Sequence, residues 1–270
     1  MKELGKYLEQ VRARAPLTLS ITNQVTINEC ANALLAIGAS PVMSDDPADA
    51  EALGALAAAT VINIGTTSRE RLEVMLSAGR GARRAGRPVV LDPVGAGATE
   101  VRRRAAGRII EEIKPDIIRG NLAEIRALAG LAFEQKGVDS AETGDAESAA
   151  AVARNLAAAL GAVVAVTGAV DALSDGQNCL LIEGGHPLMT RLTGTGCLLT
   201  AMVGAYVGAN AGPPFLGTAA ALSHLALAGA RAAESLERPG LLGTYRVRLF
   251  DYLGLISGRD LEVFQGVRQI

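Results

Sequence analysis

Short apolar runs alternate, over the first two thirds of the chain, with longer segments in which apolar residues recur at helical spacing. The short runs lack strict apolar–polar alternation, which is typical of strands buried on both faces of a parallel sheet. The predicted strands are Leu17–Ile21, Pro41–Met43, Thr60–Ile64, Pro88–Leu91, Asp116–Ile118, Val163–Val166 and Asn178–Ile182. After Thr195 the pattern predicts helices only, near 196–210, 214–236 and 241–256.

Residues that favour a helix start stand in front of several helical segments. The candidate caps are Thr26, Asp46, Ser68, Thr99 and Asn121. Glu29 and Glu124 give two of them capping-box spacing, and a proline follows Asp46 at the first helical position. The alternation of strands and helices predicts an α/β fold: a central, mostly parallel sheet with helices on both faces and an all-helical C-terminal part. We expect residues 1–270 to form a single domain.

Composition narrows the function classes. The net charge of −2 favours neither nucleic acid nor an anionic membrane as a partner. The three cysteines, Cys30, Cys179 and Cys197, have no CxxC spacing, which indicates a reducing compartment, and we expect a cytoplasmic protein. The N-terminus lacks the apolar core of a signal peptide. The apolar stretch 215–230 is too short to span a bilayer, so no membrane association is expected.

Polar residues stand where predicted strands end, and ligands of such sheets bind at the carboxyl ends of strands. Asn23 follows the first strand and could present its amide to a ligand or form a turn. Met43 ends the second strand and could touch an apolar ligand or pack in the core. Asp92, at the tip of an apolar strand before a Gly-rich loop, could hold Mg²⁺ or cap a turn.

The loops after two later predicted strands, Asp116–Ile118 and Val163–Val166, contribute charged residues and a glycine to the same edge of the sheet. Arg119 stands at the end of one predicted strand and could pair with phosphate oxygens. Glu124 either completes a local capping box with Asn121 or helps to organise Mg²⁺ beside a phosphate. Thr167 and Gly168 follow another buried strand.

The segment Gly194-Thr195-Gly196-Cys197 precedes an apolar helical run. A helix N-terminus presents free N–H groups and a positive dipole end, which suit a transferring phosphoryl group. There the pKa of the Cys197 thiol would be lowered. The alternative is a glycine turn before a buried helix, with Cys197 as a small core residue. The sequence has no P-loop pattern, so ATP would be bound on another scaffold. His224 lies in an apolar helix and is expected to be buried.

Taken in order, these segments resemble the hydroxyethylthiazole kinase family of the ribokinase-like superfamily. The matching segments are 21–23, 31–43, 91–99, 119–124, 166–168, 174–176 and 193–197, spread over most of the chain. The resemblance implies ATP-dependent phosphorylation of 4-methyl-5-(2-hydroxyethyl)thiazole in thiamine biosynthesis, with Mg²⁺ as cofactor.

The resemblance also implies roles for single residues. Gly194, Thr195, Gly196 and Cys197 match the anion hole, with Cys197 where most ribokinase relatives carry a catalytic Asp. The remaining matches are Met43, Asn23 and Gly194 for the thiazole alcohol, Arg119 and Thr167 for ATP, and Asp92 and Glu124 for Mg²⁺. The family is typically trimeric with active sites between subunits, so we expect a homotrimer.

Three other functions stay open at this stage. One is a ribokinase-like kinase of another heteroaromatic alcohol, of the hydroxymethylpyrimidine or pyridoxal type. The second is an ATP-dependent dehydratase of hydrated nicotinamide nucleotides on the same fold. The third is a nucleotide-binding protein without catalysis. The sequence departs from the family pattern at Leu19 and over 44–49, near the presumed alcohol site.

Overall fold

The structure is a computed structural model that describes residues 3–133 and 146–270. Over these residues the strands form one sheet in the order β2-β1-β3-β4-β5-β6-β7-β8-β9. The strands are β1 (Leu17–Ile21), β2 (Ser40–Val42), β3 (Ala59–Asn63), β4 (Val89–Asp92), β5 (Ile117–Asn121), β6 (Val163–Thr167), β7 (Val170–Ser174), β8 (Cys179–Glu183) and β9 (Val267–Gln269). Strands β1 to β6 pair in parallel, and the pairs from β6 to β9 are antiparallel.

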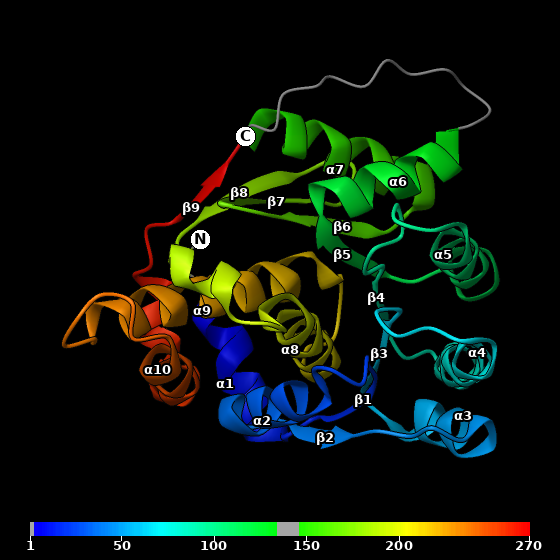
Figure 1. Cartoon of the computed structure of the whole chain (residues 1–270), viewed down its shortest axis with the longest axis horizontal. Helices are drawn as coiled ribbons and strands as arrows, with labels where there is room; N and C mark the ends of the chain where they lie inside the picture. The colour runs from blue at the N-terminus through cyan, green and yellow to red at the C-terminus, as the bar shows by residue number, and fades with distance from the viewer. Residues whose placement is uncertain (1–2, 134–145) are drawn as a thin grey trace.

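Helices cover both faces of this sheet (Figure 1). One face carries α3 (Pro47–Leu56), α4 (Arg69–Arg84), α5 (Glu100–Ile113), α6 (Leu122–Phe133) and α7 (Ala146–Leu160). The other carries α1 (Leu4–Arg14), α2 (Ile27–Ile37), α8 (Thr195–Ala209), α9 (Pro214–Glu234), α10 (Leu242–Leu255) and α11 (Gly258–Glu262). A hydrophobic core lies on each face of the sheet, and successive strand residues point into the two cores alternately. Val61 belongs to the core on the side of α8 and α9, whereas Ile62 belongs to the core on the side of α4 and α5.

All seven predicted strands are present, with ends within a few residues of the prediction. The sequence pattern missed β7 and β9. Two residues separate β7 from β6, and β7 carries Asp171, so it lacks the continuous apolar run typical of buried strands. The expectation of an all-helical C-terminal part is wrong for the last residues, because β9 adds an exposed, polar edge strand after α11.

The helix starts follow the predicted caps in all but one case. Asp46, Ser68 and Thr99 each accept backbone N–H groups with their side chains. Thr26 makes no side-chain cap to α2. The charged, weakly hydrophobic stretch 134–148 is typical of a surface excursion in the sequence. It lies outside the described residues except for 146–148, which begin α7. No helix among the described residues is both long and apolar enough to span a membrane.

The central helix α8 is packed tightly against the sheet, which fixes where it begins. A Cβ on Gly204 would lie 2.5 Å from Cγ2 of Val61 on β3, so only glycine allows this approach. On the other side, the Tyr206 hydroxyl and Nδ1 of His224 on α9 lie 2.7 Å apart, and both residues are fully buried, as expected for His224. Helix α8 therefore holds its N-terminus at the carboxyl ends of the central parallel strands.

Candidate active site

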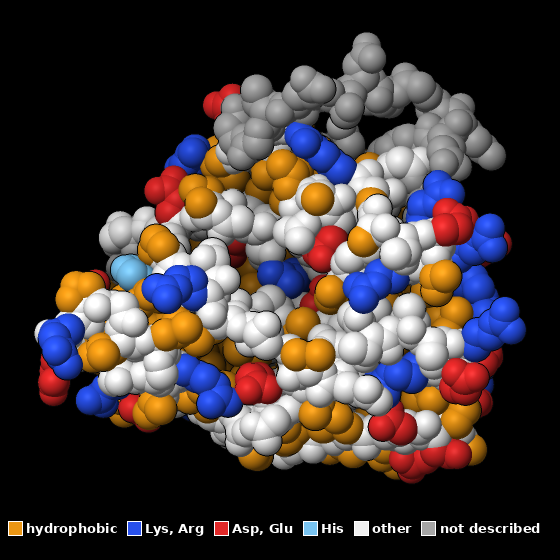
Figure 2. Space-filling view, viewed as in Figure 1, with side chains coloured by type: hydrophobic (Ala, Val, Ile, Leu, Met, Phe, Trp, Pro, Cys, Tyr) orange, Lys and Arg blue, Asp and Glu red, His pale blue; other side chains and the backbone are white. Residues whose placement is uncertain are grey.

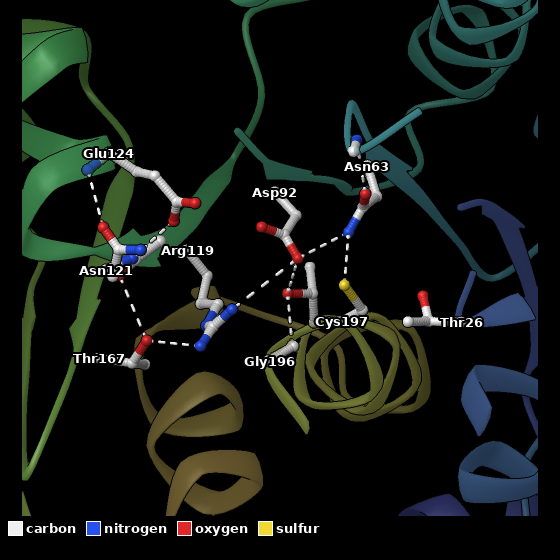
Figure 3. Close-up of polar contacts among 12 residues, drawn as sticks. Thr26, Asn63, Asp92, Arg119, Asn121, Glu124, Thr167, Gly196 and Cys197 are labelled. Carbon is white, nitrogen blue, oxygen red and sulfur yellow. Dashed lines mark hydrogen bonds and ion pairs between the residues drawn. The ribbon is translucent and has the colours of Figure 1, made fainter. Parts of the chain in front are cut away.

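Five polar side chains, on or just after five different parallel strands, lie around the start of α8, and Figure 3 labels all of them except Asn23. Four of them stand at or just beyond the carboxyl end of a strand and Arg119 stands two residues before it, where register brings the strand ends together. They are Asn23 after β1, Asn63 on β3, Asp92 on β4, Arg119 on β5 and Thr167 on β6. Four of the five are residues that the sequence indicated, and Asn63 is the addition.

The first turn of α8 has the predicted form. Gly194 precedes it with φ +89°, and a Cβ there would lie 2.7 Å from Cγ2 of Thr26. A Cβ on Gly196 would lie 2.6 Å from the Arg119 guanidinium. Thr195 donates its hydroxyl to the carbonyl groups of Met189 and Leu192, which ties the turn down. The first N–H groups of a helix have no intrahelical acceptor, so this turn presents donors beside a guanidinium.

Asp92 is fully buried and is the acidic centre of the site. Its Oδ2 accepts hydrogen bonds from Nδ2 of Asn63 and Oγ1 of Thr200, each at 2.8 Å, and lies 3.8 Å from the Arg119 guanidinium. Its Oδ1 is buried without a hydrogen-bond partner. Burial raises the pKa of Asp92 to about 6, although the Arg119 charge opposes the shift. An unsatisfied carboxylate oxygen in such a place is a position for a cation or a water molecule.

Cys197 lies in the first turn of α8 and is partly exposed. Its Sγ accepts N–H groups from Nδ2 of Asn23 at 3.1 Å and from Nδ2 of Asn63 at 3.2 Å. The expected lowering of the thiol pKa is wrong. Burial, followed by the nearby charge of Asp92, raises the pKa of Cys197 above its ordinary value and outweighs the hydrogen bonds from Thr26, Asn63 and Asn23.

Asn63 was missed by sequence reasoning, although a signal was available. It is a buried amide at the end of a mostly apolar strand, where a polar side chain needs partners. Its Oδ1 accepts Nδ2–H of Asn23 at 3.1 Å and the backbone N–H of Gly65 at 2.9 Å. The residue thereby joins β1, β3, β4 and α8.

Arg119 lies between the acidic centre and a cleft. Its guanidinium donates to Oγ1 of Thr167 and also faces Asp92, so the two residues predicted for ATP lie together (Figure 3). The cleft beside them has a volume of about 720 Å³. Its lining includes Arg119, Thr167, Asp171, His186, Thr195 and Gly196, and Figure 2 shows the hollow at the middle of this face. A cleft of this volume is in the range of small-molecule sites.

Asp171 is a second residue of this cleft that the sequence did not indicate as functional. It sits on β7, and its Oδ1 accepts the backbone N–H of Gly168 at 3.0 Å. Burial raises the pKa of Asp171 to about 6, with the Gly168 hydrogen bond and the Arg119 charge opposing. The carboxyl group fixes the turn that follows Thr167.

Glu124 forms the capping box that its spacing predicted. Its Oε2 accepts the N–H of Asn121 at 2.8 Å, and Oδ1 of Asn121 accepts the N–H of Glu124 at 2.9 Å. Its other oxygen accepts the N–H of Gly95 at 2.9 Å, which ties the loop after β4 to α6. Within the described residues no three His, Cys, Asp or Glu side chains are arranged to hold a metal ion by themselves.

Met43 was predicted as a site residue, but none of the contacts described above involves it. It directly follows β2, the edge strand beside β1, and packs half-buried against the core on the α8 side of the sheet. The interpretation of Met43 as a partly buried core residue therefore describes its observed packing.

The mostly parallel sheet that carries this glycine-bounded helix start, buried carboxylate and adjacent cleft has a ribokinase-like fold. A ribokinase-like superfamily protein from Enterococcus faecalis has this fold, with a TM-score of 0.63, 14% identity and coverage of 96% of this chain and 95% of that one. The solved hydroxyethylthiazole kinase protein from Pyrococcus horikoshii OT3 matches with a TM-score of 0.89 and 39% identity over 100% of both chains.

Sequence comparison gives the family. The family model of the hydroxyethylthiazole kinase family matches residues 8–258. A curated hydroxyethylthiazole kinase from Cereibacter sphaeroides is 46% identical over 262 residues, which are 97% of each chain. The chain belongs to the hydroxyethylthiazole kinase family.

Proposed function

We propose that this protein transfers the γ-phosphoryl group of ATP to the hydroxyl of 4-methyl-5-(2-hydroxyethyl)thiazole, a step of thiamine biosynthesis. The observation that carries the proposal is the start of α8, where the first helical turn carries Cys197 and lies beside the Arg119 guanidinium. Named kinases that are 39–46% identical over nearly the whole chain support the same reaction.

ATP is proposed to lie in the cleft beside Arg119 and Thr167. Arg119 is almost entirely enclosed by protein, since its side chain is only 11% exposed, and this strengthens its attraction for phosphate. The N–H groups of Thr195, Gly196 and Cys197 would then stabilise charge on the transferring phosphoryl group. Such positioning and charge stabilisation account for most of the catalysis of phosphoryl transfer.

The thiazole alcohol is proposed to lie on the Cys197 side of the site, near Asn23, Gly194 and Met43. Cys197 would take up the proton that leaves the attacking hydroxyl. Its raised pKa makes the thiol form dominant in the free enzyme at neutral pH, so we assign it a modest share of the rate. The amide N–H groups of Asn23 and Asn63 would stabilise negative charge on the sulfur.

Mg²⁺ fits the residues present. The unpartnered Oδ1 of Asp92 offers one hard oxygen ligand, and Mg²⁺ typically takes one or two carboxylates with water and substrate phosphates. Glu124 would not bind Mg²⁺ directly, because both of its carboxylate oxygens already accept backbone N–H groups; it would help to position the loop beside the ion. When bound, the ion would neutralise phosphate charge.

A homotrimer is also proposed, with the active sites between subunits. The surface near the alcohol side carries exposed apolar side chains, with Val25 64% and Ile27 39% exposed next to Asn23 and Thr26. Leu35 and Val247, 59% and 60% exposed, line a groove between α2 and α10. Such a surface is typical of contacts between copies. Sedimentation equilibrium should give three times the 27.7 kDa chain mass, and a monomer would refute the assembly.

The direct test measures ADP release from Mg-ATP with and without the thiazole alcohol, together with mass detection of the product. A thiazole-dependent product with one added phosphate supports the proposal. Turnover with hydroxymethylpyrimidine or pyridoxal but not with the thiazole would replace the substrate, and ADP formation only with hydrated nicotinamide nucleotides would replace the reaction.

A further inference from the structure

The amide of Asn63 has only one possible orientation. The backbone N–H of Gly65 can donate but not accept, so the group facing it at 2.9 Å must be the side-chain oxygen Oδ1. The amide nitrogen Nδ2 therefore points the other way, toward Asp92 and Cys197. The orientation follows from hydrogen-bond chemistry and needs no knowledge of hydrogen positions.

Every hydrogen-bonding position of this amide is in use. Oδ1 accepts from Gly65 and Asn23, and the two N–H groups reach Oδ2 of Asp92 at 2.8 Å and Sγ of Cys197 at 3.2 Å. Both of the latter atoms are acceptors. One planar group thus spans the distance between the buried carboxylate and the sulfur (Figure 3).

The Asn23 amide is fixed in the same way. Its Oδ1 accepts the N–H of Val25 at 3.1 Å, so its Nδ2 must face Oδ1 of Asn63 and Sγ of Cys197. Two amides, each oriented by a backbone N–H group, deliver one N–H apiece to the sulfur. The sulfur is therefore held as an acceptor at a fixed position at the start of α8.

We propose that Asn63 is a positioning residue for phosphoryl transfer, which uses its two amide N–H groups to hold the Cys197 sulfur and the Asp92 carboxylate in one fixed arrangement. The inference rests on the proposed role of Cys197. Asn63 acts on the reaction through these two groups, so its removal should slow the chemical step and leave ATP binding in the cleft almost unchanged.

The test is a double-mutant cycle on the whole protein. Asn63→Ala should lower kcat about 10- to 100-fold, the loss expected for hydrogen bonds to charged groups, with the KM for ATP within about threefold of wild type. Thr200→Val removes another donor from the same Asp92 oxygen without touching the sulfur. It therefore measures how much of the loss in kcat comes from removing one hydrogen bond to Asp92. In a Cys197→Ala background, the effect of Asn63→Ala should shrink to that of Thr200→Val.

Two further variants control for folding. Thr60→Val lies on the same strand, is fully buried, and loses a hydroxyl that has no hydrogen-bond partner, so its kcat should equal that of wild type. Asn63→Asp keeps the shape and the acceptor for Gly65, but one carboxyl oxygen replaces both N–H groups, and its single proton is shared with the Asp92 carboxylate. No donor to the Cys197 sulfur remains, so kcat should be lower than that of wild type. This variant decides the matter if Asn63→Ala does not fold.

The outcomes distinguish the positioning role of Asn63 from the base role of Cys197. Equal losses from Asn63→Ala in the wild-type and Cys197→Ala backgrounds would overturn the positioning role, as would wild-type kcat in Asn63→Asp. An unchanged kcat in Cys197→Ala alone would refute the proposed base, and the inference would fall with it. A slow Cys197→Ala with no coupling to Asn63 refutes the inference only.

Discussion

Acid should weaken this protein through His224, whose ring is buried between the central helices. Burial, and second the charge of Arg12, lowers the pKa of His224 from 6.5 to about 3. The folded protein therefore keeps the ring neutral where the unfolded chain takes up a proton. The resulting stability is fully present above pH 6.5 and is lost as the pH falls from 6.5 toward 3.

The size of the effect follows from the two pKa values. One unit of pKa difference corresponds to about 1.4 kcal/mol, so His224 should cost between about 1 and 2 kcal/mol of stability by pH 5.5 and about 3 kcal/mol by pH 4.5. Asp92 and Asp171, with pKa values raised to about 6, act in the opposite direction, because their protonated forms favour the folded state as the pH falls. The contribution of His224 must therefore be isolated with a variant.

His224→Asn keeps an acceptor near the Tyr206 hydroxyl but cannot take up a proton. We expect it to be about 1 kcal/mol less stable than wild type at pH 7.5 because of lost packing. At pH 4.5 it should be about 2 kcal/mol more stable, with the two curves crossing at about pH 6. Urea unfolding followed by far-ultraviolet circular dichroism measures this, since the chain has no tryptophan for fluorescence.

The control is Tyr206→Phe, which loses the hydroxyl that contacts Nδ1 but keeps the titrating ring. It should retain the acid-dependent loss of wild type. Parallel curves for wild type and His224→Asn from pH 8 to 4.5 would refute the reasoning, since they would mean that His224 binds its proton equally in both states.

Three further predictions concern the site itself. Cys197→Ala should lower kcat by about 10²-fold, the low end for a general base, yet leave measurable activity. Cys197→Asp should keep or raise the activity because two amide donors already face that position, and an inactive but folded Cys197→Asp would contradict the base role. Glu124→Gln should raise the Mg²⁺ concentration needed for half-maximal rate, because an amide NH₂ would then face a backbone N–H; an unchanged Mg²⁺ titration would remove Glu124 from metal organisation. Gly196→Ala should raise the KM for ATP about tenfold or more by displacing Arg119, and a wild-type KM would show that Arg119 does not bind the nucleotide.

Local interactions explain why much of the site could be predicted. The capping box of Asn121 and Glu124, the cap at Asp46 and the glycines before α8 depend on residues a few positions apart, so their spacing in the sequence is their geometry. The carboxyl ends of parallel strands meet at one edge of a sheet, and ligands bind there, which is why Asp92 and Arg119 were predicted as candidate site residues. The short edge strand β9 is held by pairing with β8 alone, and no local pattern indicates it.

The amino-acid sequence by itself determined the parallel α/β fold, the glycine-bounded start of α8 and most of the residues around it, because hydrophobic periodicity, capping and strand ends are read over short distances. Only the tertiary structure decided the pKa of Cys197 and the role of Asn63. The position of Cys197 in the first helical turn alone would lower its thiol pKa. Burial and the charge of Asp92, which is 105 positions away along the chain, raise the pKa instead. Electrostatic free energies depend on distance and burial in space, and these are set by the packing of α8 against the sheet.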